Sequence, residues 1–349
     1  MTHSCTYFDR GYLAVGLALW ESLRRHEPDA VLHVLALDED VAAVLRAREE
    51  PGLRVVALAE LLAADPELAA VQAQRSRAEF IFTLTPCFVR HLLRTLPETG
   101  PLFYLDADLY FFGALASVRE EMGPGSIYIV PHRYPPWHDD AAFYGRFNVG
   151  VLGFRGEANG LACLDWWRQR CLESCALRHD GTSYGDQKYL DEWPARFTGV
   201  VISAHPGINL APWNWAGHRM AVTPDGVTVD GRPLVVFHFA QFRRISEHWY
   251  DSGQLEYGIM PLPLRSRLYG EYASALDRAE ASIAAVRPDV PPLRRSWSST
   301  LGPWHLALLR LFWGQCWLRV GRWWVAGRLG LGRFSGHALG RYRGRKRAA

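Results

Sequence analysis

The sequence predicts an α/β fold, and three observations favour that class. Short apolar runs of strand type alternate with amphipathic segments of helix type, as in a layered sheet. Several of these runs begin or end at polar residues, as expected where strands meet a ligand crevice. With 349 residues, 49% hydrophobic and 21% charged, the chain can bury a substantial core. A doubly wound sheet is therefore expected.

The predicted elements follow one another in a regular order. Leu13, Leu17, Trp20 and Leu23 show the helical spacing that defines the first helix. The first half of the chain predicts strands at 5–8, 31–37 and 53–57 and helices at 12–26, 41–47, within 58–73 and at 80–96. Further strands are expected at 102–112, 126–130, 149–154, near 200 and at 234–239, and further helices at 161–176 and 186–193. Pro86 suits the start of its helix better than the middle.

Two carboxylates, Asp106 and Asp108, interrupt the apolar run 102–112. A buried strand cannot hold two charges without partners, so the pair is expected where the strand emerges at a sheet edge. There the carboxylates could bind a hard divalent cation, which in turn could hold the phosphates of a nucleotide. The alternative is that they cap the next element or fix a turn.

Three other passages place polar groups beside apolar runs. Asn148 could recognise hydroxyls or satisfy backbone groups before its strand. Asp186 and Gln187 follow a glycine at a loop-to-helix junction, where they could orient a sugar, although Asp186 also suits a helix N-cap. His238 could be a third metal ligand or a packed core histidine.

Taken together, these passages resemble the retaining glycosyltransferases of the GT-A fold, especially glycosyltransferase family 8 and related bacterial nucleotide-diphospho-sugar transferases. The resemblance extends over about residues 4–243. It is carried by Tyr104-Leu105-Asp106-Ala107-Asp108, Phe147-Asn148-Val149-Gly150-Val151, Gly185-Asp186-Gln187 and His238-Phe239. It implies a Rossmann-like, mixed central sheet flanked by helices, and transfer of a hexose-like sugar from a nucleotide-diphosphate donor, UDP-linked, to an acceptor hydroxyl with retention.

The resemblance also implies roles for individual residues. Asp106, Asp108 and His238 would bind Mn²⁺ or Mg²⁺, and the cation would bridge the diphosphate of the donor. Residues of the N-terminal strand and loop would receive the nucleobase, and they are Thr6, Tyr7, Asp9 and Tyr12. The residues that would contact the donor sugar or flank its anomeric carbon are Asn148, Asp186 and Gln187, with Gln187 near the face attacked.

Some family positions are different here. The arginine that family 8 places on the helix before its acidic motif is missing at 82–87, and Arg77 or Arg90 could replace it. His238 lacks the usual Gly-x-x-Lys-Pro-Trp continuation, so Arg243 or Arg244 could supply the phosphate contact. The segments 205–209 and 212–214 resemble the acceptor side of the family, although aromatic packing equally explains their Trp213.

The C-terminal tail differs in composition from the rest of the chain. After Asp289 the tail has twelve Arg or Lys and no acid, so it carries +12 and the remainder −9. Apolar and aromatic residues from Pro303 to Ala326 lie on one arc at helical spacing, which predicts a helix on an anionic membrane surface or one packed on the body. We therefore expect a catalytic domain at 1–250, a helical linker at 251–300 and a basic, Trp-rich amphipathic tail at 301–349.

Other features restrict the function and location. The chain has no Gly-rich phosphate loop, only two lysines and no nucleic-acid reader motif. No signal peptide is evident, so a cytoplasmic enzyme is expected, peripheral on the membrane through its tail, with a glycan, lipid-linked or small-molecule acceptor. The six cysteines are expected to be reduced. The alternatives are a non-catalytic sugar-nucleotide or membrane-binding module, and a sugar-phosphate nucleotidyltransferase, whose N-terminal loop is absent.

Overall fold

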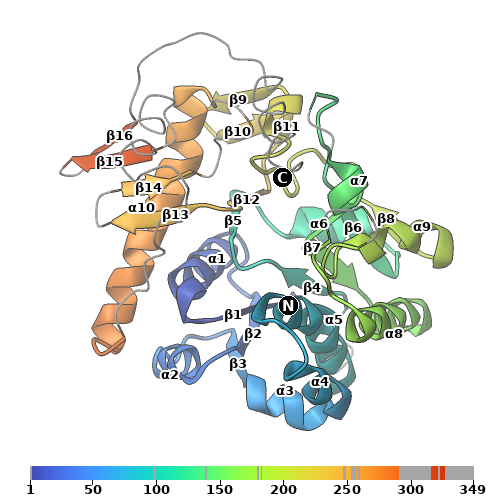
Figure 1. Ribbon diagram of the computed structural model, residues 1–349. Helices are drawn as coiled ribbons and strands as arrows, with labels where there is room; N and C mark the ends of the chain where they lie inside the picture. The colour runs from blue at the N-terminus through green and yellow to red at the C-terminus, as the bar shows by residue number, and fades with distance from the viewer. Residues whose placement is uncertain are drawn as a thin grey trace, which may run out of the picture.

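A computed structural model describes residues 2–96, 100–137, 140–178, 181, 183–246, 249–252, 257, 260–290, 316–320 and 323–326. Its centre is a seven-stranded sheet with the order β3-β2-β1-β4-β7-β6-β8 (Figure 1). The strands are β1 (His3–Phe8), β2 (Val31–Ala36), β3 (Leu53–Ala57), β4 (Leu102–Leu105), β6 (Ile127–Pro131), β7 (Phe147–Phe154) and β8 (Val200–Ile202). Neighbours are parallel from β3 to β4, whereas β7 is antiparallel to both β4 and β6. The sheet is therefore mixed, and the predicted α/β class is confirmed.

Helices cover both faces of this sheet. The helices are α1 (Leu13–His26), α2 (Glu39–Ala47), α3 (Leu58–Ala64), α4 (Pro66–Gln72), α5 (Arg77–Thr95), α6 (Ala116–Met122), α7 (Ala141–Tyr144), α8 (Ala158–Glu173), α9 (Trp193–Arg196) and α10 (Leu262–Val286). One core packs α1, α2, α6 and part of α10 on one face, and a second packs α3, α4, α5 and α8 on the other. Side chains alternate between the cores along β4, where Phe103 and Leu105 join the first core and Leu102 and Tyr104 the second.

Smaller sheets extend from the central one. They consist of β5 (Leu109–Phe111) with β12 (Val236–His238), of β9 (Met220–Thr223), β10 (Gly226–Val229) and β11 (Arg232–Pro233), and of β13 (Arg243–Ser246), β14 (Trp249–Asp251), β15 (Cys316–Val320) and β16 (Trp323–Ala326). Strand β12 is antiparallel to β5, with His238 opposite Leu109. The chain thus leaves the central sheet after Leu105 and enters the β5–β12 sheet at Leu109. The turn between them is the Asp106–Asp108 segment.

The structure corrects two predicted helices. The prediction of one helix at 186–193 is wrong, because a 3₁₀ turn, η2 (Lys188–Glu192), leads into the short α9. In the tail, the helix predicted for Pro303–Ala326 is wrong where the structure describes it, since β15 and β16 form an antiparallel pair that continues from β14. The remainder of that segment lies outside the described residues.

Pro86 also lies elsewhere than predicted, in the middle of α5 rather than near its start. This helix begins at a capping box, in which Ser76 and Glu79 each bond the backbone of the other. Among the described cysteines, five are buried and free of disulfides, as expected. No described helix is long and apolar enough to cross a membrane. The domain boundaries at 250 and 300 stay predictions.

Candidate cation and sugar-binding site

Backbone hydrogen bonds hold the Asp106–Asp108 turn from both sides. The Asp106 amide donates to the Gly150 carbonyl of β7 at 2.9 Å, which extends the β4–β7 ladder by one bond. The Asp108 carbonyl accepts from the Phe239 amide, also at 2.9 Å, just past the end of β12. The Leu109 amide closes the turn on the Asp106 carbonyl at 3.2 Å. The two carboxylates are therefore fixed relative to both sheets.

This turn brings Asp106 and Asp108 together with His238. One ligand atom from each of the three residues lies within 4.8 Å of the others. His238 Nε2 is 3.0 Å from Asp108 Oδ1 and 3.7 Å from Asp106 Oδ2. The imidazole is only 7% exposed, whereas the carboxylates are 27% and 20% exposed, so the cluster is open on its acidic side. The Tyr104 hydroxyl donates to Asp106 Oδ1 at 2.8 Å and orients that carboxylate.

The electrostatics of this cluster favour a bound positive charge. Burial raises the pKa of Asp106, and repulsion from Asp108 adds to the shift, while His238 opposes it. Burial by itself lowers the pKa of His238, but attraction and a hydrogen bond to Asp108, with help from Asp106, raise it above the ordinary value. Two carboxylate oxygens and one imidazole nitrogen form a donor set that fits a divalent cation such as Mn²⁺.

A chain of side-chain amides, of which Asn209 and Asn148 are buried and Gln187 is half-buried, continues from His238. His238 Nδ1 lies 3.1 Å from Asn209 Oδ1, and Asn209 Nδ2 donates to Asn148 Oδ1 at 2.8 Å. Asn148 Nδ2 donates in turn to Gln187 Oε1 at 2.9 Å, and Gln187 Nε2 donates to the Tyr144 carbonyl at 2.8 Å. The sequence pattern did not identify Asn209 as a partner of His238, because 29 positions separate the two residues.

Gly150 lies in contact with this chain of amides. A Cβ at Gly150 would come within 2.6 Å of Asn148 Oδ1, 2.9 Å of His238 Nδ1 and 3.1 Å of Asn209 Oδ1. The Gly150 amide also donates to Asn148 Oδ1 at 2.9 Å. A side chain at this position would displace three polar atoms together, so the fold requires glycine there. The glycine was a visible signal in the sequence.

Asp186 belongs to a second group of hydrogen-bonded polar side chains. It is 4% exposed, and its Oδ2 accepts from Thr85 Oγ1 at 2.8 Å; Thr85 Oγ1 also lies 3.0 Å from the Tyr7 hydroxyl. Burial raises the pKa of Asp186 to about 7, Asp106 adds to the shift, and the bond from Thr85 opposes it. The Asp186 carbonyl accepts from Trp167 Nε1 at 2.8 Å. Thr85 was missed from the sequence, although a hydroxyl in the apolar helix 80–96 was a weak signal.

The four residues predicted to receive a nucleobase differ in their surroundings. Thr6 Oγ1 is buried in β1 and has no hydrogen-bond partner among the described residues. The Tyr7 ring lies 5.8 Å from that of Tyr104, which places it beside the Asp106 side of the site. Asp9 forms an ion pair with Arg77 at 2.6 Å. Tyr12 ends the short turn η1 (Arg10–Tyr12).

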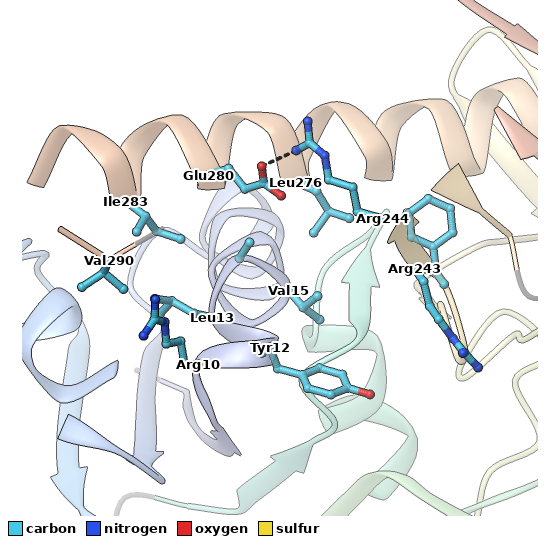
Figure 2. A pocket seen from close by; sticks show the side chains of 13 residues that line it. Arg10, Tyr12, Leu13, Val15, Arg243, Arg244, Leu276, Glu280, Ile283 and Val290 are labelled. Atoms are coloured by element: carbon cyan, nitrogen blue, oxygen red, sulfur yellow. Dashed lines mark hydrogen bonds and ion pairs between the residues drawn. The ribbon is translucent and has the colours of Figure 1, made fainter. Parts of the chain in front are cut away.

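Tyr12 lines a cavity of about 70 Å³ between the start of α1, residues 242–244 and α10. Figure 2 shows Arg244 directed toward Glu280 on α10, whereas Arg243 extends away from that helix. Arg244 forms ion pairs with both Glu280 and Asp277. Of the two arginines that could contact phosphate, Arg243 is therefore the one directed away from α10.

Arg90 and Trp213, two further residues singled out from the sequence, both contact other parts of the protein. Arg90, a candidate for the missing family arginine, forms an ion pair with Asp165 of α8. The Trp213 ring lies 5.2 Å from the His238 ring in an edge-on arrangement, and its Nε1 donates to the His132 carbonyl at 3.1 Å. Trp213 thus packs against the candidate metal ligand, as the aromatic-packing alternative predicts, and this contact leaves its proposed acceptor role untested.

The fold and the cluster define this chain as an α/β protein with a candidate divalent-cation site where two sheets meet. It belongs to the same family as YfnF of Bacillus subtilis (strain 168), with 31% identity over 251 residues, which cover 69% of this chain and 82% of YfnF. YfnD of the same organism is 29% identical over 298 residues, covering 82% of this chain and 92% of YfnD. Both relatives are named as uncharacterized proteins.

Solved structures of glycosyltransferases are also similar to the chain. Galactosyltransferase LgtC, in complex with donor and acceptor sugar analogs, is 17% identical in sequence. The match covers 79% of this chain and 96% of the LgtC chain, with a TM-score of 0.48. Glycosyltransferase GlyE of Streptococcus pneumoniae TIGR4 is 16% identical in sequence. The match covers 86% of this chain and 68% of the GlyE chain, also with a TM-score of 0.48. No family model matches the chain.

Proposed function

We propose that the chain is a divalent-cation-dependent glycosyltransferase that moves a sugar from a UDP-sugar to an acceptor hydroxyl with retention at the anomeric carbon. The convergence of Asp106, Asp108 and His238 carries the proposal, because His238 is 130 positions from Asp108 in the sequence, yet ligand atoms of all three residues lie within 4.8 Å of one another. Four short motifs that resemble those of family 8 support it further. The rest of the site is interpreted from this cluster outward.

The proposed cation ligands are Asp106, Asp108 and His238. A bound Mn²⁺ or Mg²⁺ would stabilise the departing diphosphate as a Lewis acid. Asp106 is held for this task by Tyr104, and Asp108 by the backbone bond from Phe239. Because the carboxylates are the more exposed members of the cluster, we propose that the diphosphate approaches from their side.

Arg243 is the proposed second contact to the diphosphate. Arg243 lies in the part of the sequence where family 8 has a lysine. The neighbouring Arg244 is the weaker candidate, because its charge is neutralised by Glu280 and Asp277. Arginine binds phosphate through several N–H groups in a plane, so its geometry differs from that of the family's lysine. The nearby Tyr12 and the strand residues Thr6, Tyr7 and Asp9 are proposed to form the side that receives the nucleobase.

Asn148, Asp186 and Gln187 are the proposed residues beside the donor sugar. The Asn148 side chain already bonds Gly150, Asn209, Gln187 and His132, so a sugar hydroxyl would have to replace one of these bonds in order to contact it. Asp186, with its pKa raised to about 7 by burial, changes charge near neutral pH. We propose that ionised Asp186 stabilises positive charge that develops at the anomeric carbon.

The nature of the acceptor is inferred from composition alone. The twelve basic residues after Asp289 and the tryptophans among them support a lipid-linked or envelope glycan at an anionic membrane surface. Such a site would be cytoplasmic and peripheral. A glycan or small-molecule acceptor away from the membrane is the alternative outcome of an acceptor screen.

Release of nucleoside diphosphate from a panel of nucleotide sugars tests the proposal. The full chain is incubated with each donor and Mn²⁺, with and without a chelator. Asp106→Asn and Asp108→Asn each remove one charge without changing the shape of the side chain, and we expect each to reduce release about 100-fold or more. The matched control is Asp29→Asn, at an exposed aspartate outside the site, which should behave as the wild type.

Several outcomes would contradict the proposal. Full activity of either folded aspartate variant would remove the metal assignment. Donor binding, seen as a rise in unfolding temperature, without release in any acceptor pool would favour the non-catalytic module. Consumption of a nucleoside triphosphate with a sugar phosphate would favour the nucleotidyltransferase.

A further inference from the structure

We propose that Asn209 is a positioning residue, which holds His238 in the tautomer and ring orientation that present Nε2 to Asp106 and Asp108. Asn209 contacts neither the proposed cation nor the sugar, and acts through His238 and Asn148. This inference rests on the proposed function in one respect, namely that the group bound by Nε2 is a divalent cation.

The assignment starts from a backbone group whose direction is not in doubt. The Gly150 N–H can only donate, and it lies 2.9 Å from an Asn148 side-chain atom, which must therefore be the oxygen Oδ1. The Asn209 atom 2.8 Å from the same oxygen must then be the donor Nδ2. Because these two contacts fix both amides, no choice of amide orientation is left for Asn209.

The tautomer of His238 follows from the orientation of Asn209. With Nδ2 directed at Asn148, Asn209 presents Oδ1 to His238 Nδ1 at 3.1 Å. An amide oxygen only accepts, so Nδ1 carries the proton. Without a cation, Nε2 also carries a proton, which it donates to Asp108 Oδ1 at 3.0 Å, so a cation that bound here would replace the proton on Nε2 and leave the one on Nδ1. Metal-binding histidines in general donate their other N–H to such an outer partner.

The backbone around Asn209 is built to hold this side chain in place. Asn209 is fully buried and has a φ of +59°, a left-handed conformation that asparagine tolerates better than most residues. Its carbonyl accepts from Asn214 Nδ2 at 3.3 Å. The next residue, Leu210, bonds β12 in both directions, since its amide donates to Val236 at 3.2 Å and its carbonyl accepts from His238 at 2.7 Å. Asn209 and the ring that it orients are thus fixed to the same strand.

Two substitutions separate the functions of this side chain. Asn209→Gly deletes it and permits the positive φ, whereas alanine would be strained there. Asn209→Asp keeps an oxygen for His238 Nδ1 and loses the donor to Asn148. The matched control is Glu49→Gly, at an exposed residue outside the site with a φ of +48°.

The first measurement is ¹⁵N NMR of histidine-labelled protein at a Mg²⁺ concentration that just saturates the wild type, with the His238 signals assigned by loss in His238→Asn. We expect the wild type, Asn209→Asp and the control to show a proton on Nδ1 and a cation on Nε2 in place of a proton. Asn209→Gly should show a mixture with the Nε2–H form, because its Nδ1 proton has lost its acceptor and Asp108 keeps the proton on Nε2. The second measurement is Mn²⁺ affinity by electron paramagnetic resonance, which should fall by at least about tenfold in Asn209→Gly and recover in part in Asn209→Asp.

The results separate this inference from the proposed function. An Nε2–H tautomer in the wild type, or a folded Asn209→Gly with the wild-type spectrum and a Mn²⁺ affinity within about twofold of the wild type, would overturn the positioning role. If Asn209→Gly does not fold, the wild-type spectrum and the Asn209→Asp affinity decide the matter. The expected tautomer and affinities without any sugar transfer would support the inference and remove only the proposed function.

Discussion

The burial of Asp186 predicts that the protein becomes more stable when this carboxylate is replaced by an amide. Asp186 is 4% exposed, and its carboxylate accepts a hydrogen bond from the Thr85 hydroxyl. Burial raises its pKa from 3.8 to about 7. The folded state therefore binds a proton between about pH 4 and pH 7 that the unfolded chain releases. The contribution of Asp186 to stability is fully present below about pH 4 and is lost as the pH rises through about 7.

The size of this effect follows from the shift. A pKa raised by about 3 corresponds to about 4 kcal/mol at a pH above both values, which is an upper limit because the site can relax. The amide introduced by Asp186→Asn would keep an oxygen for the Thr85 hydroxyl and cannot ionise. We expect this variant to unfold with a free energy about 2–4 kcal/mol higher than that of the wild type at pH 8, and only about 1.5 kcal/mol higher at pH 5.

Urea unfolding followed by circular dichroism at pH 5, 6, 7 and 8 measures this difference. The buffers contain a chelator, so that no divalent cation contributes, and Asp29→Asn is the exposed control. A difference between the wild type and Asp186→Asn that does not change with pH, or a less stable variant at pH 8, would refute the argument. If the proposed role of Asp186 is correct, the same variant loses sugar transfer while it gains stability.

Two more substitutions test the packing. Gly150→Ala should lower the free energy of unfolding by about 1–3 kcal/mol and weaken Mn²⁺ binding, because the new Cβ meets three polar atoms. Urea unfolding and Mn²⁺ titration measure the two effects. The control is Gly156→Ala, where the atoms nearest to the new Cβ would be 4.0 Å away. Equal effects of the two changes would contradict the close fit. In the same unfolding assay, Asp65→Asn should lower the free energy of unfolding by about 2–4 kcal/mol, because it leaves the buried Arg168 without its main partner. Asp40→Asn, which breaks the half-exposed ion pair with Arg10, should lower it by less than about 1 kcal/mol. A similar cost for both would show that burial does not control these ion pairs.

Sequence patterns were sufficient for the parts of the site that lie at strand ends. Asp106, Asp108 and His238 each interrupt or end an apolar run, and such runs are strands that end at sheet edges. The structure brings these three residues together because β5, which follows the acidic turn, pairs with β12. Their likeness to a known motif gave the order of the segments. Their predicted roles in binding and catalysis stay predictions.

Other parts of the structure depend on contacts that no local pattern encodes. Thr85 reaches Asp186 across 101 positions, and only the packing of α5 against the sheet brings them together. In the tail, apolar residues from 303 to 326 fit a helical arc, yet the described portions are the short strands β15 and β16. The partner of β15 outside the tail, β14, lies more than 60 positions earlier, so a periodicity count could not include it. Tertiary pairing outweighed the local period there.

The position of the acidic turn between two sheets has a consequence for the folding of the chain. Asp106 and His238 are 132 positions apart, so a cation that bound both would act as a non-covalent cross-link closing a loop of that length. Asn148, Gln187 and Asn209 all lie within the closed loop. The site can therefore form only after both ends of the loop have folded, and no truncated chain that ends before β12 would retain the cation affinity.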